Sequence, residues 1–304
     1  MSGVEIQSSL SNGNDKKEAS HDDDIRHLRD WLPKQPHLPP ITNEQLSTFL
    51  HACYYSLERT KKTIDQYYTV RAAVPELFSG CNPKKPEIQK VFDSVNFVRV
   101  PEVTPKGGFR IYFASLQNFE PANFDFENSL KAFIMMTDVN LMHETQVPGY
   151  VLVLDATGVC LGHIPRISIP MLKKFLIYVQ EAMPIRLKQI HVINAQAIVD
   201  KIYAIAKPFL KGEIIEIIQF HKPGNMDTFY DCVSKDILPK ELGGKSKTIE
   251  TLHSENKRKV EDSTDYLQAL EKTAKADESK RPGQPKGHGE IFGMEGSFRK
   301  LTLD

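Results

Sequence analysis

Apolar side chains recur at helical spacing through the first quarter of the chain. Ile25, Leu28 and Trp31 fall on one face of a helix, which a proline-rich stretch then ends. Further stripes with helical spacing follow as far as Pro75. The pattern therefore predicts an all-helical module over residues 21–80.

From about residue 86 the pattern changes to short apolar runs that alternate with longer helical stretches. This alternation is typical of strands joined by helical crossovers in an α/β sheet. The predicted strands cover residues 97–100, 109–114, 150–155, 189–194 and 215–220, and the predicted helices cover 130–142, 168–182 and 196–210. Runs such as Tyr-Val-Leu-Val-Leu lack polar alternation, which indicates strands covered on both faces. We expect an α/β domain over residues 86–250.

The two ends of the chain differ from its body in composition. Residues 1–20 carry too little apolar surface to offset the entropy of ordering, so we expect a disordered tail. Residues 251–304 are predicted to contain a short helix at 264–275 and then an extended tail rich in Lys, Gly and Pro. Four apolar residues near the end either pack back on the body or serve a function, and the sequence leaves both open: Phe292, Phe298, Leu301 and Leu303.

Composition and charge narrow the possible function classes. Lys plus Arg equals Asp plus Glu at 39 each, which removes an overall electrostatic attraction to nucleic acid. The first thirty residues lack the apolar core of a secretory signal, and no run of about 18 apolar residues suggests a membrane span. The four cysteines lie far apart, unlike those of a zinc site or a disulfide framework. We therefore expect a cytosolic protein whose membrane contact is peripheral.

Three partial motifs for catalysis or metal binding fail on inspection. Gly-Gly-Lys-Ser at 243–246 resembles the end of a phosphate-binding loop, but proline occupies the place of its first glycine. The start of a zinc-protease helix at His143 fails because the second histidine is a valine. Cys160 and His163 are merely close in sequence. The sequence therefore predicts no enzyme, no metal site and no cofactor.

Residues 196–210 are strongly amphipathic. The apolar stripe consists of Ile198, Val199, Ile202, Ile205, Ala206, Phe209 and Leu210, opposite Asp200, Lys201, Lys207 and Lys211. Pro208 weakens the helix late in its course and Gly212 permits a bend, so the element could hinge there. The pattern alone fits an ordinary packed helix and a movable lid equally well.

Four sequence stretches occur in a specific order. They are LRDWLPKQPHLPP (28–40), YVLVLDATGV (150–159), IHVINAQAIVDKIYAIAKPFL (190–210) and DILPKELGG (236–244). In combination they resemble the CRAL-TRIO lipid-binding family, most closely its branch of tocopherol-transfer, clavesin and retinaldehyde-binding proteins. The ending GSFRKLTLD is similar to that of insect members. The resemblance implies an N-terminal helical module and an α/β domain whose hydrophobic ligand cavity is covered by a gate helix.

The resemblance also implies a set of ligand-binding residues. Matching the family segments gives Ala132, Met136, Tyr150, Leu154, Leu161, Ile167, Phe175, Tyr178, Val179, Ile185 and Ile190, with Val199, Ile202, Ile205, Ala206 and Leu210 from the gate. Tyr178 is the sharpest prediction, because a phenol on an apolar helix face needs a hydrogen-bond partner and a ligand could supply it.

A second set of residues concerns membranes. The tocopherol-transfer branch recognises phosphoinositide headgroups with a basic cleft, whose matching positions here are Cys53, Arg186, Glu213 and Ile217. Arg186 alone keeps the charge, and nearby substitutes are Lys188, Lys207 and Lys211. We expect general attraction to acidic membranes rather than phosphoinositide selectivity.

The function implied by the resemblance is lipid transfer without chemistry. A monomeric protein would enclose one hydrophobic small molecule, such as a tocopherol, retinoid, carotenoid or other lipid, and exchange it with membranes. It would act in the cytoplasm, peripheral to endosomal or other intracellular membranes, with no nucleic-acid partner. The alternative is a lipid-sensing regulatory or interaction protein that binds phosphoinositides.

Overall fold

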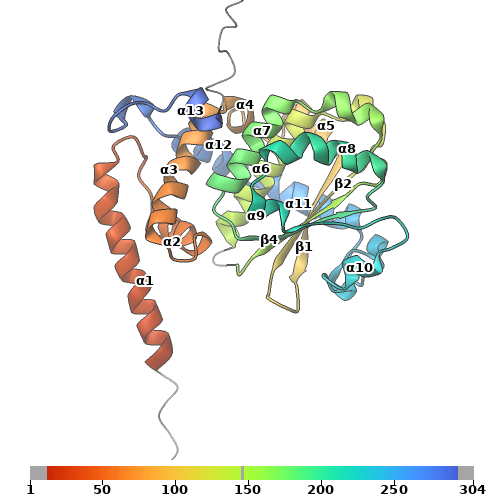
Figure 1. Ribbon diagram of the computed structural model, residues 1–304, viewed down its shortest axis with the longest axis horizontal. Helices are drawn as coiled ribbons and strands as arrows, with labels where there is room; N and C mark the ends of the chain where they lie inside the picture. Colours follow the sequence, from red (N-terminus) through yellow and green to blue (C-terminus); the bar gives the residue numbers. More distant parts are fainter. Residues whose placement is uncertain (1–11, 145–146, 294–304) are drawn as a thin grey trace, which may run out of the picture.

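The computed structural model describes residues 12–144 and 147–293, with a helical module beside a sheet domain (Figure 1). The module consists of α1 (Asn12–Trp31), α2 (Asn43–Ala52), α3 (Leu57–Ala73) and α4 (Pro75–Phe78), with a 3-10 turn, η1 (Leu32–Lys34), directly after α1. This confirms the predicted helical module. Its core includes the fully buried side chains of Leu28, Leu46, Leu50 and Ile64, one or more from each long helix.

Helix α1 extends further toward the N-terminus than the sequence pattern predicts. Residues 12–20, expected to be part of a disordered tail, continue the helix. Lys, Glu and Ala in this stretch are good helix formers, and the packed turn around Leu28 provides a nucleus from which the helix can propagate. Residues 1–11 of the predicted tail lie outside the described residues.

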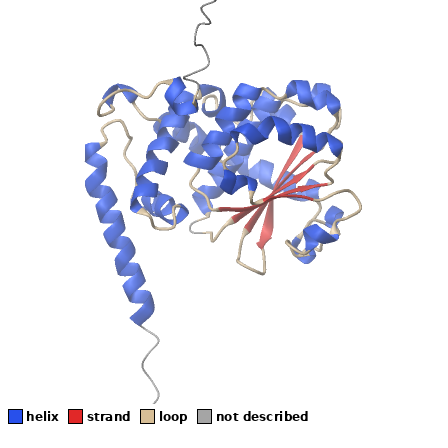
Figure 2. Cartoon of the chain, in the orientation of Figure 1, coloured by secondary structure: helices blue, strands red, loops and turns tan. Residues whose placement is uncertain are grey.

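The sheet has five strands in the order in which they occur in the chain. They are β1 (Val95–Val103), β2 (Arg110–Leu116), β3 (Tyr150–Asp155), β4 (Leu187–Ile193) and β5 (Ile218–Phe220). β1 and β2 pair antiparallel, whereas the remaining neighbours are parallel, which requires a crossover before each of β3, β4 and β5. Figure 2 shows the strands as one twisted sheet packed against helices. The α/β prediction is confirmed.

Helical segments cover both faces of the sheet. One face meets α6 (Phe126–His143), α7 (Ile169–Ile177) and α8 (Ala197–Ala206). The other face packs on the segment that contains α10 (Asp227–Tyr230), η6 (Lys235–Ile237) and η7 (Lys240–Leu242), through a core that includes Phe229 and Val233. Short elements complete the domain: α5 (Pro86–Phe92), η2 (Pro121–Asn123), η3 (Leu161–Arg166), η5 (Lys207–Phe209) and α9 (Gly212–Ile215).

Two predicted helices change their helical geometry before their predicted ends, and the last predicted strand, 215–220, begins only at Ile218. The predicted helix 196–210 stops as an α-helix at Ala206 and continues as the 3-10 turn η5, because Pro208 cannot donate the next helical hydrogen bond. The predicted helix 168–182 changes after Ile177 into a π-helical turn, η4 (Tyr178–Ala182). Such turns insert one extra residue and are frequent at functional sites.

The C-terminal segment is more ordered than the predicted extended tail. Helix α11 (Ile249–Asp262), which the sequence analysis missed, packs against β1 and α6, and α12 (Thr264–Thr273) matches the predicted short helix. The chain then crosses the helical module, with η8 (Glu278–Lys280) on the way, and reaches α13 (His288–Phe292), the last helix within the described residues. Phe292 is buried in the module core. Of the two possibilities left open by the sequence, this residue therefore packs back on the body. Phe298, Leu301 and Leu303 lie outside the described residues.

One carboxylate holds this returning segment in place. Asp65 of α3 accepts from Arg281 Nη1 at 2.7 Å and from Lys286 Nζ at 2.5 Å, and lies 2.8 Å from His37 Nε2. Backbone bonds add to the contact, because the amide of Ala276 donates to the carbonyl of Tyr68. The segment from 276 to 292 therefore belongs to the folded body and does not project as a free tail.

Candidate ligand-binding site

The helix-covered face of the sheet forms one wall of a cavity. On β3, the side chains of Tyr150, Leu152 and Leu154 face the cavity, whereas Val151 and Val153 belong to the core on the opposite face. The neighbouring strands follow the same alternation, with Ile190 and Val192 of β4 on the cavity side. Strand alternation thus makes the wall that the sheet contributes to the cavity apolar.

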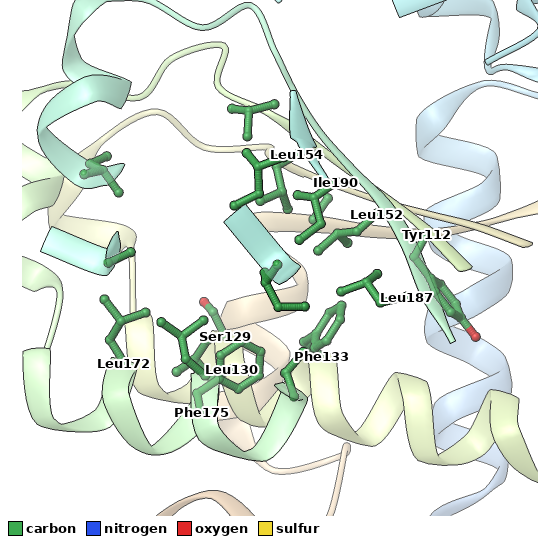
Figure 3. Close-up of a pocket in the computed structure, with 18 of the residues that line it drawn as sticks. Tyr112, Ser129, Leu130, Phe133, Leu152, Leu154, Leu172, Phe175, Leu187 and Ile190 are labelled. Atoms are coloured by element: carbon green, nitrogen blue, oxygen red, sulfur yellow. The ribbon is translucent and has the colours of Figure 1, made fainter. Parts of the chain in front are cut away.

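Helices provide the opposite wall. Leu130 and Phe133 come from α6, and Leu172 and Phe175 come from α7 (Figure 3). Phe133 and Phe175 contact each other edge to face, with ring centroids 5.9 Å apart. The cavity has a volume of about 450 Å³, within the range of about 300–1,000 Å³ that is usual for small-molecule sites.

Helix α8 closes the cavity with its apolar face. Val199, Ile202 and Ala206 line the cavity, while Asp200 and Lys201 on the other side of the helix are exposed to solvent. These members of the stripe seen in the sequence therefore face the cavity rather than a filled core. Leu210 and Ile214, beyond the 3-10 turn, continue the lining.

Polar contacts tie the end of α8 to the π-helical turn. The Gln180 amide nitrogen donates to the carbonyls of Leu176 and Phe209, at 2.9 and 3.0 Å. Its oxygen accepts from the backbone N–H of Lys211 at 2.8 Å. Lys211 Nζ also lies 3.0 Å from the carboxylate of Glu181. The π-helical turn thus places the side chains of Gln180 and Glu181 next to the end of η5.

Comparison with known families agrees with this architecture. Residues 17–88 match the family model of a Pinta-like UBA domain, and residues 102–244 match that of the CRAL/TRIO domain. Residues 102–244 therefore form a CRAL-TRIO domain.

Individual relatives are similar over most of the chain. The alpha-tocopherol transfer protein-like protein of Homo sapiens is 29% identical over 231 residues, which cover 75% of this chain and 66% of that protein. Clavesin-1 of Xenopus laevis is 23% identical over 224 residues, which cover 73% of this chain and 67% of that protein. The match thus spans about two thirds of the relatives' length. The crystal structure of Sfh5 shares the fold, with a TM-score of 0.54 at 12% identity over 81% of this chain and 93% of that one.

Most of the residues predicted from the family resemblance line the cavity. They are Tyr150, Leu154, Phe175, Val179, Ile185, Ile190, Val199, Ile202, Ala206 and Leu210. They come from β3, β4, α7, η4 and α8, which are far apart in the sequence. Their contact with a ligand stays a prediction.

Six predicted residues lie elsewhere. Ala132 and Met136 are on the side of α6 that packs against α5, because residues 132 and 136 are one turn apart on the same face. Leu161 is 62% exposed, and neither Ile167 nor Ile205 borders the cavity. These five positions correct the family-based set.

The sixth residue, Tyr178, has a protein partner. Its hydroxyl accepts a hydrogen bond from Arg71 Nη1 at 3.3 Å, and the side chain is fully buried outside the cavity. Desolvation by burial raises the pKa of this phenol, so it stays neutral. The hydroxyl thus has a partner within the protein, and Tyr178 does not border the cavity. Arg71 lies more than one hundred positions away in the sequence and could not be inferred as its partner.

Sequence reasoning missed much of the cavity wall. Further lining residues include Phe97, Phe124, Leu130, Phe133, Leu141, Leu152, Leu172, Leu187, Val192, Tyr203 and Phe220. Leu152 could have been predicted from strand alternation, because residues 150 and 154 were already assigned to the ligand site. Leu130, Phe133 and Leu141 follow helical spacing along α6 and could have been found in the same way.

The four predicted membrane-binding cations occupy two separate environments. Arg186 donates to the carbonyl of His51 at 2.7 Å and stacks over the Tyr54 ring at 4.3 Å, while Lys188 Nζ donates to the Tyr54 hydroxyl at 2.6 Å. Lys211 pairs with the carboxylate of Glu181, and Lys207 is exposed directly after α8. The first two cations therefore stabilise the turn after α2 instead of pointing freely into solvent.

The described residues contain no group of acidic, histidine and cysteine side chains that could hold a metal. Cys160 Sγ lies 3.4 Å from His163 Nδ1, but that nitrogen also accepts from the Cys160 backbone N–H at 3.1 Å and so caps the turn η3. The pair does not line the cavity.

None of the helices within residues 12–144 and 147–293 is long and apolar enough to cross a bilayer.

Proposed function

We propose that this protein encloses one hydrophobic small molecule in its cavity and exchanges it with membranes through movement of α8. The observation that carries the proposal is the cavity of about 450 Å³, whose apolar walls come from the sheet, α6, α7 and α8. The relatives named for tocopherol transfer support the same class of function. The cargo would be a tocopherol, retinoid, carotenoid or similar lipid, and it would leave chemically unchanged.

The apolar walls make release into water slow. A ligand that buries about 400 Å² of apolar surface gains on the order of 10 kcal/mol from that burial, before ordering costs. Direct passage into a bilayer avoids this barrier, because the ligand exchanges one apolar environment for another. Contact with a membrane would therefore control the rate of exchange.

Helix α8 is suited to act as the gate. Its apolar face can contact either the ligand or acyl chains, and the elements after it provide a bend at Pro208 and Gly212. The Gln180 contacts to Phe209 and Lys211 hold the closed position. Opening would break these hydrogen bonds, each of which contributes about 1 kcal/mol net.

Membrane contact would be peripheral and electrostatic. Lys201 and Lys207 are exposed on the polar side of the gate, and each cation near an acidic surface contributes about 1 kcal/mol. We expect weak, salt-sensitive binding with little preference among phosphoinositides. The protein would work as a monomer at endosomal or other intracellular membranes, without a nucleic-acid partner.

The test begins with the cargo itself. The full-length protein, purified from its native source, is extracted with solvent and the extract is analysed by mass spectrometry. The loaded protein is then mixed with increasing amounts of acceptor vesicles, and we expect the transfer rate to rise with vesicle concentration. The recovered lipid should keep its mass.

Two results would contradict the proposal. A transfer rate that stays flat as vesicles increase would mean release through water, and a lipid of altered mass would indicate an enzyme. Ligand that stays bound at every vesicle concentration would favour the alternative of a lipid-sensing interaction protein.

A further inference from the structure

The π-helical turn η4 forms the wall between the helical module and the cavity. Tyr178 and Ala182 on one side of the turn are buried in the module core, whereas Val179 and Gln180 border the cavity. A π-helical turn inserts one extra residue into a helix and so changes the direction of the side chains that follow. The turn can therefore present polar groups to two different parts of the molecule.

The carboxylate of Glu181 contacts both of these parts. Its Oε2 accepts a hydrogen bond from Gln66 Nε2 of α3 at 3.3 Å. Its Oε1 lies 3.0 Å from Nζ of Lys211, one of the two residues between η5 and α9. Helix α3 lies between α1 and the sheet domain (Figure 1). One carboxylate thus joins the helical module to the segment directly after α8.

The side-chain amide of Gln66 contributes little to stability. Within residues 12–144 and 147–293, no partner reaches its buried Oε1. A buried carbonyl oxygen without a hydrogen bond destabilises a fold, and turning the amide over would place this oxygen against the Glu181 carboxylate. A leucine of similar size would avoid the unpaired oxygen. The feature that a leucine would lack is the donor to Glu181.

Other contacts of η4 follow the same route. The Tyr178 hydroxyl accepts from Arg71 Nη1 of α3, which fixes the start of the turn on the module. Gln180 then binds the carbonyl of Phe209 and the backbone N–H of Lys211. Helix α3 therefore positions the turn, and the turn positions the segment after α8. A movement of α3 away from η4 would release that segment.

We propose that the helical module restrains the opening of α8, with Gln66 and Glu181 as the positioning residues that connect the two. The contacts form a series from α3 through Glu181 to Lys211, so the loss of either contact interrupts the connection. Ligand release then depends on how closely the module packs against η4. This inference rests on the proposed role of α8 in ligand exchange.

The first measurement needs no ligand. Hydrogen exchange of the full-length protein, followed by mass spectrometry, reports on the backbone amides of residues 207–215. We expect Gln66→Leu to raise their exchange rates about threefold, because the segment after α8 opens more often. The denaturant midpoint should stay unchanged, because the variant removes an unpaired oxygen and leaves Glu181, which is 23% exposed, accessible to water.

A matched control is Lys62→Leu, at an exposed position one turn earlier in α3. It should change neither the exchange rates of residues 207–215 nor the midpoint. Unchanged exchange in Gln66→Leu would overturn the inference. The same holds if exchange rises only together with a loss of global stability, because Gln66 would then be an ordinary structural residue.

A double variant tests whether the contacts act in series. Lys211→Met removes the other contact of Glu181 and should also raise exchange about threefold. In a series, Gln66→Leu/Lys211→Met exchanges no faster than either single variant. Two independent contacts would instead multiply, to about ninefold. Multiplied rates would show that Glu181 does not connect the module to the segment after α8.

Release of a neutral dye separates this inference from the proposed function. Protein loaded with Nile red is mixed with phosphatidylcholine vesicles, whose lack of net charge makes the change at Lys211 irrelevant to vesicle attraction. We expect release to be about threefold faster in Gln66→Leu than in Lys62→Leu. Faster hydrogen exchange with unchanged dye release would support the connection and refute the role of α8 in ligand exchange. If wild-type protein does not bind the dye, hydrogen exchange alone decides the inference.

Discussion

The guanidinium of Arg71 and the carboxylate of Asp138 meet through two hydrogen bonds, of 3.1 and 3.0 Å, between α3 of the helical module and α6 of the sheet domain. Both side chains are almost completely buried, at 2% and 5% exposure. Arg71 also stacks over the rings of Tyr67 and Phe78 and donates to Tyr178 at the start of the π-helical turn. This ion pair therefore joins both parts of the molecule next to the π-helical turn that contacts the segment after α8.

Removing one partner of this pair should be costly. Arg71→Met leaves the Asp138 carboxylate buried without a cation, so we expect the free energy of unfolding to fall by about 3–5 kcal/mol. Denaturant unfolding followed by circular dichroism measures the change. The double variant Arg71→Met/Asp138→Leu should recover most of the loss, because no buried charge remains. Equal destabilisation of single and double variants would contradict this explanation.

The Gln180 contacts predict a variant that folds normally but releases its ligand faster. Gln180→Leu keeps the side-chain size while removing the hydrogen bonds to Phe209 and Lys211. Since each bond contributes about 1 kcal/mol net, ligand release should become about tenfold faster or more. Stopped-flow measurement of release to vesicles gives the rate. The same substitution at Gln117, which is exposed and outside the cavity lining, is the matched control. An unchanged rate of ligand release in Gln180→Leu would show that these hydrogen bonds do not hold α8 in the closed position.

A charge on the inner face of the gate should empty the cavity. Ile202 lines the cavity from α8, so Ile202→Asp places a carboxylate against apolar walls. Ligand affinity should fall about 10- to 100-fold, with the circular-dichroism spectrum preserved. Lys201→Asp, on the exposed side of the same turn, controls for charge and helix propensity. The role of α8 would be refuted by full ligand retention in Ile202→Asp.

A histidine pair beneath the sheet predicts loss of stability in acid. His191 Nδ1 lies 3.0 Å from His221 Nε2, and His221 Nδ1 lies 2.8 Å from the Thr228 hydroxyl. Burial, with a smaller contribution from His221, lowers the pKa of His191 from 6.5 to about 4. Because the folded pKa is depressed, the stabilisation is complete above pH 6.5 and is lost as the pH falls toward 4.

The size of this effect is at most about 3 kcal/mol, since one pKa unit corresponds to about 1.4 kcal/mol. Thermal unfolding between pH 7.5 and 4 measures it, and the relevant readout is the slope of stability with pH. His191→Leu should reduce that slope, although burial also lowers the pKa of His51 to about 4 and part of the slope should remain. An unchanged slope in His191→Leu would assign the acid sensitivity to other groups.

The sequence by itself determined the class of the fold and the position of the amphipathic helix that borders the cavity. Hydrophobic periodicity is a local property, so the helical module, the α/β alternation and the stripe from Val199 to Leu210 could be read directly along the chain. Tyr150 and Leu154 came from the family resemblance, and strand alternation explains why both lie on one face. Each of these predictions depends on residues at most about four positions apart.

Tertiary structure alone decided which apolar and polar groups face each other. Tyr178 was matched to a ligand but meets Arg71, and Ala132 and Met136 turned into α5 rather than into the cavity. Asp65 receives cations from residues more than two hundred positions later, which orders a segment predicted to be an extended tail. The sequence pattern around an apolar or charged residue is the same whichever distant residue its side chain contacts. Only the packing of distant elements selects that partner, because burial free energy depends on which surfaces meet rather than on their separation in sequence.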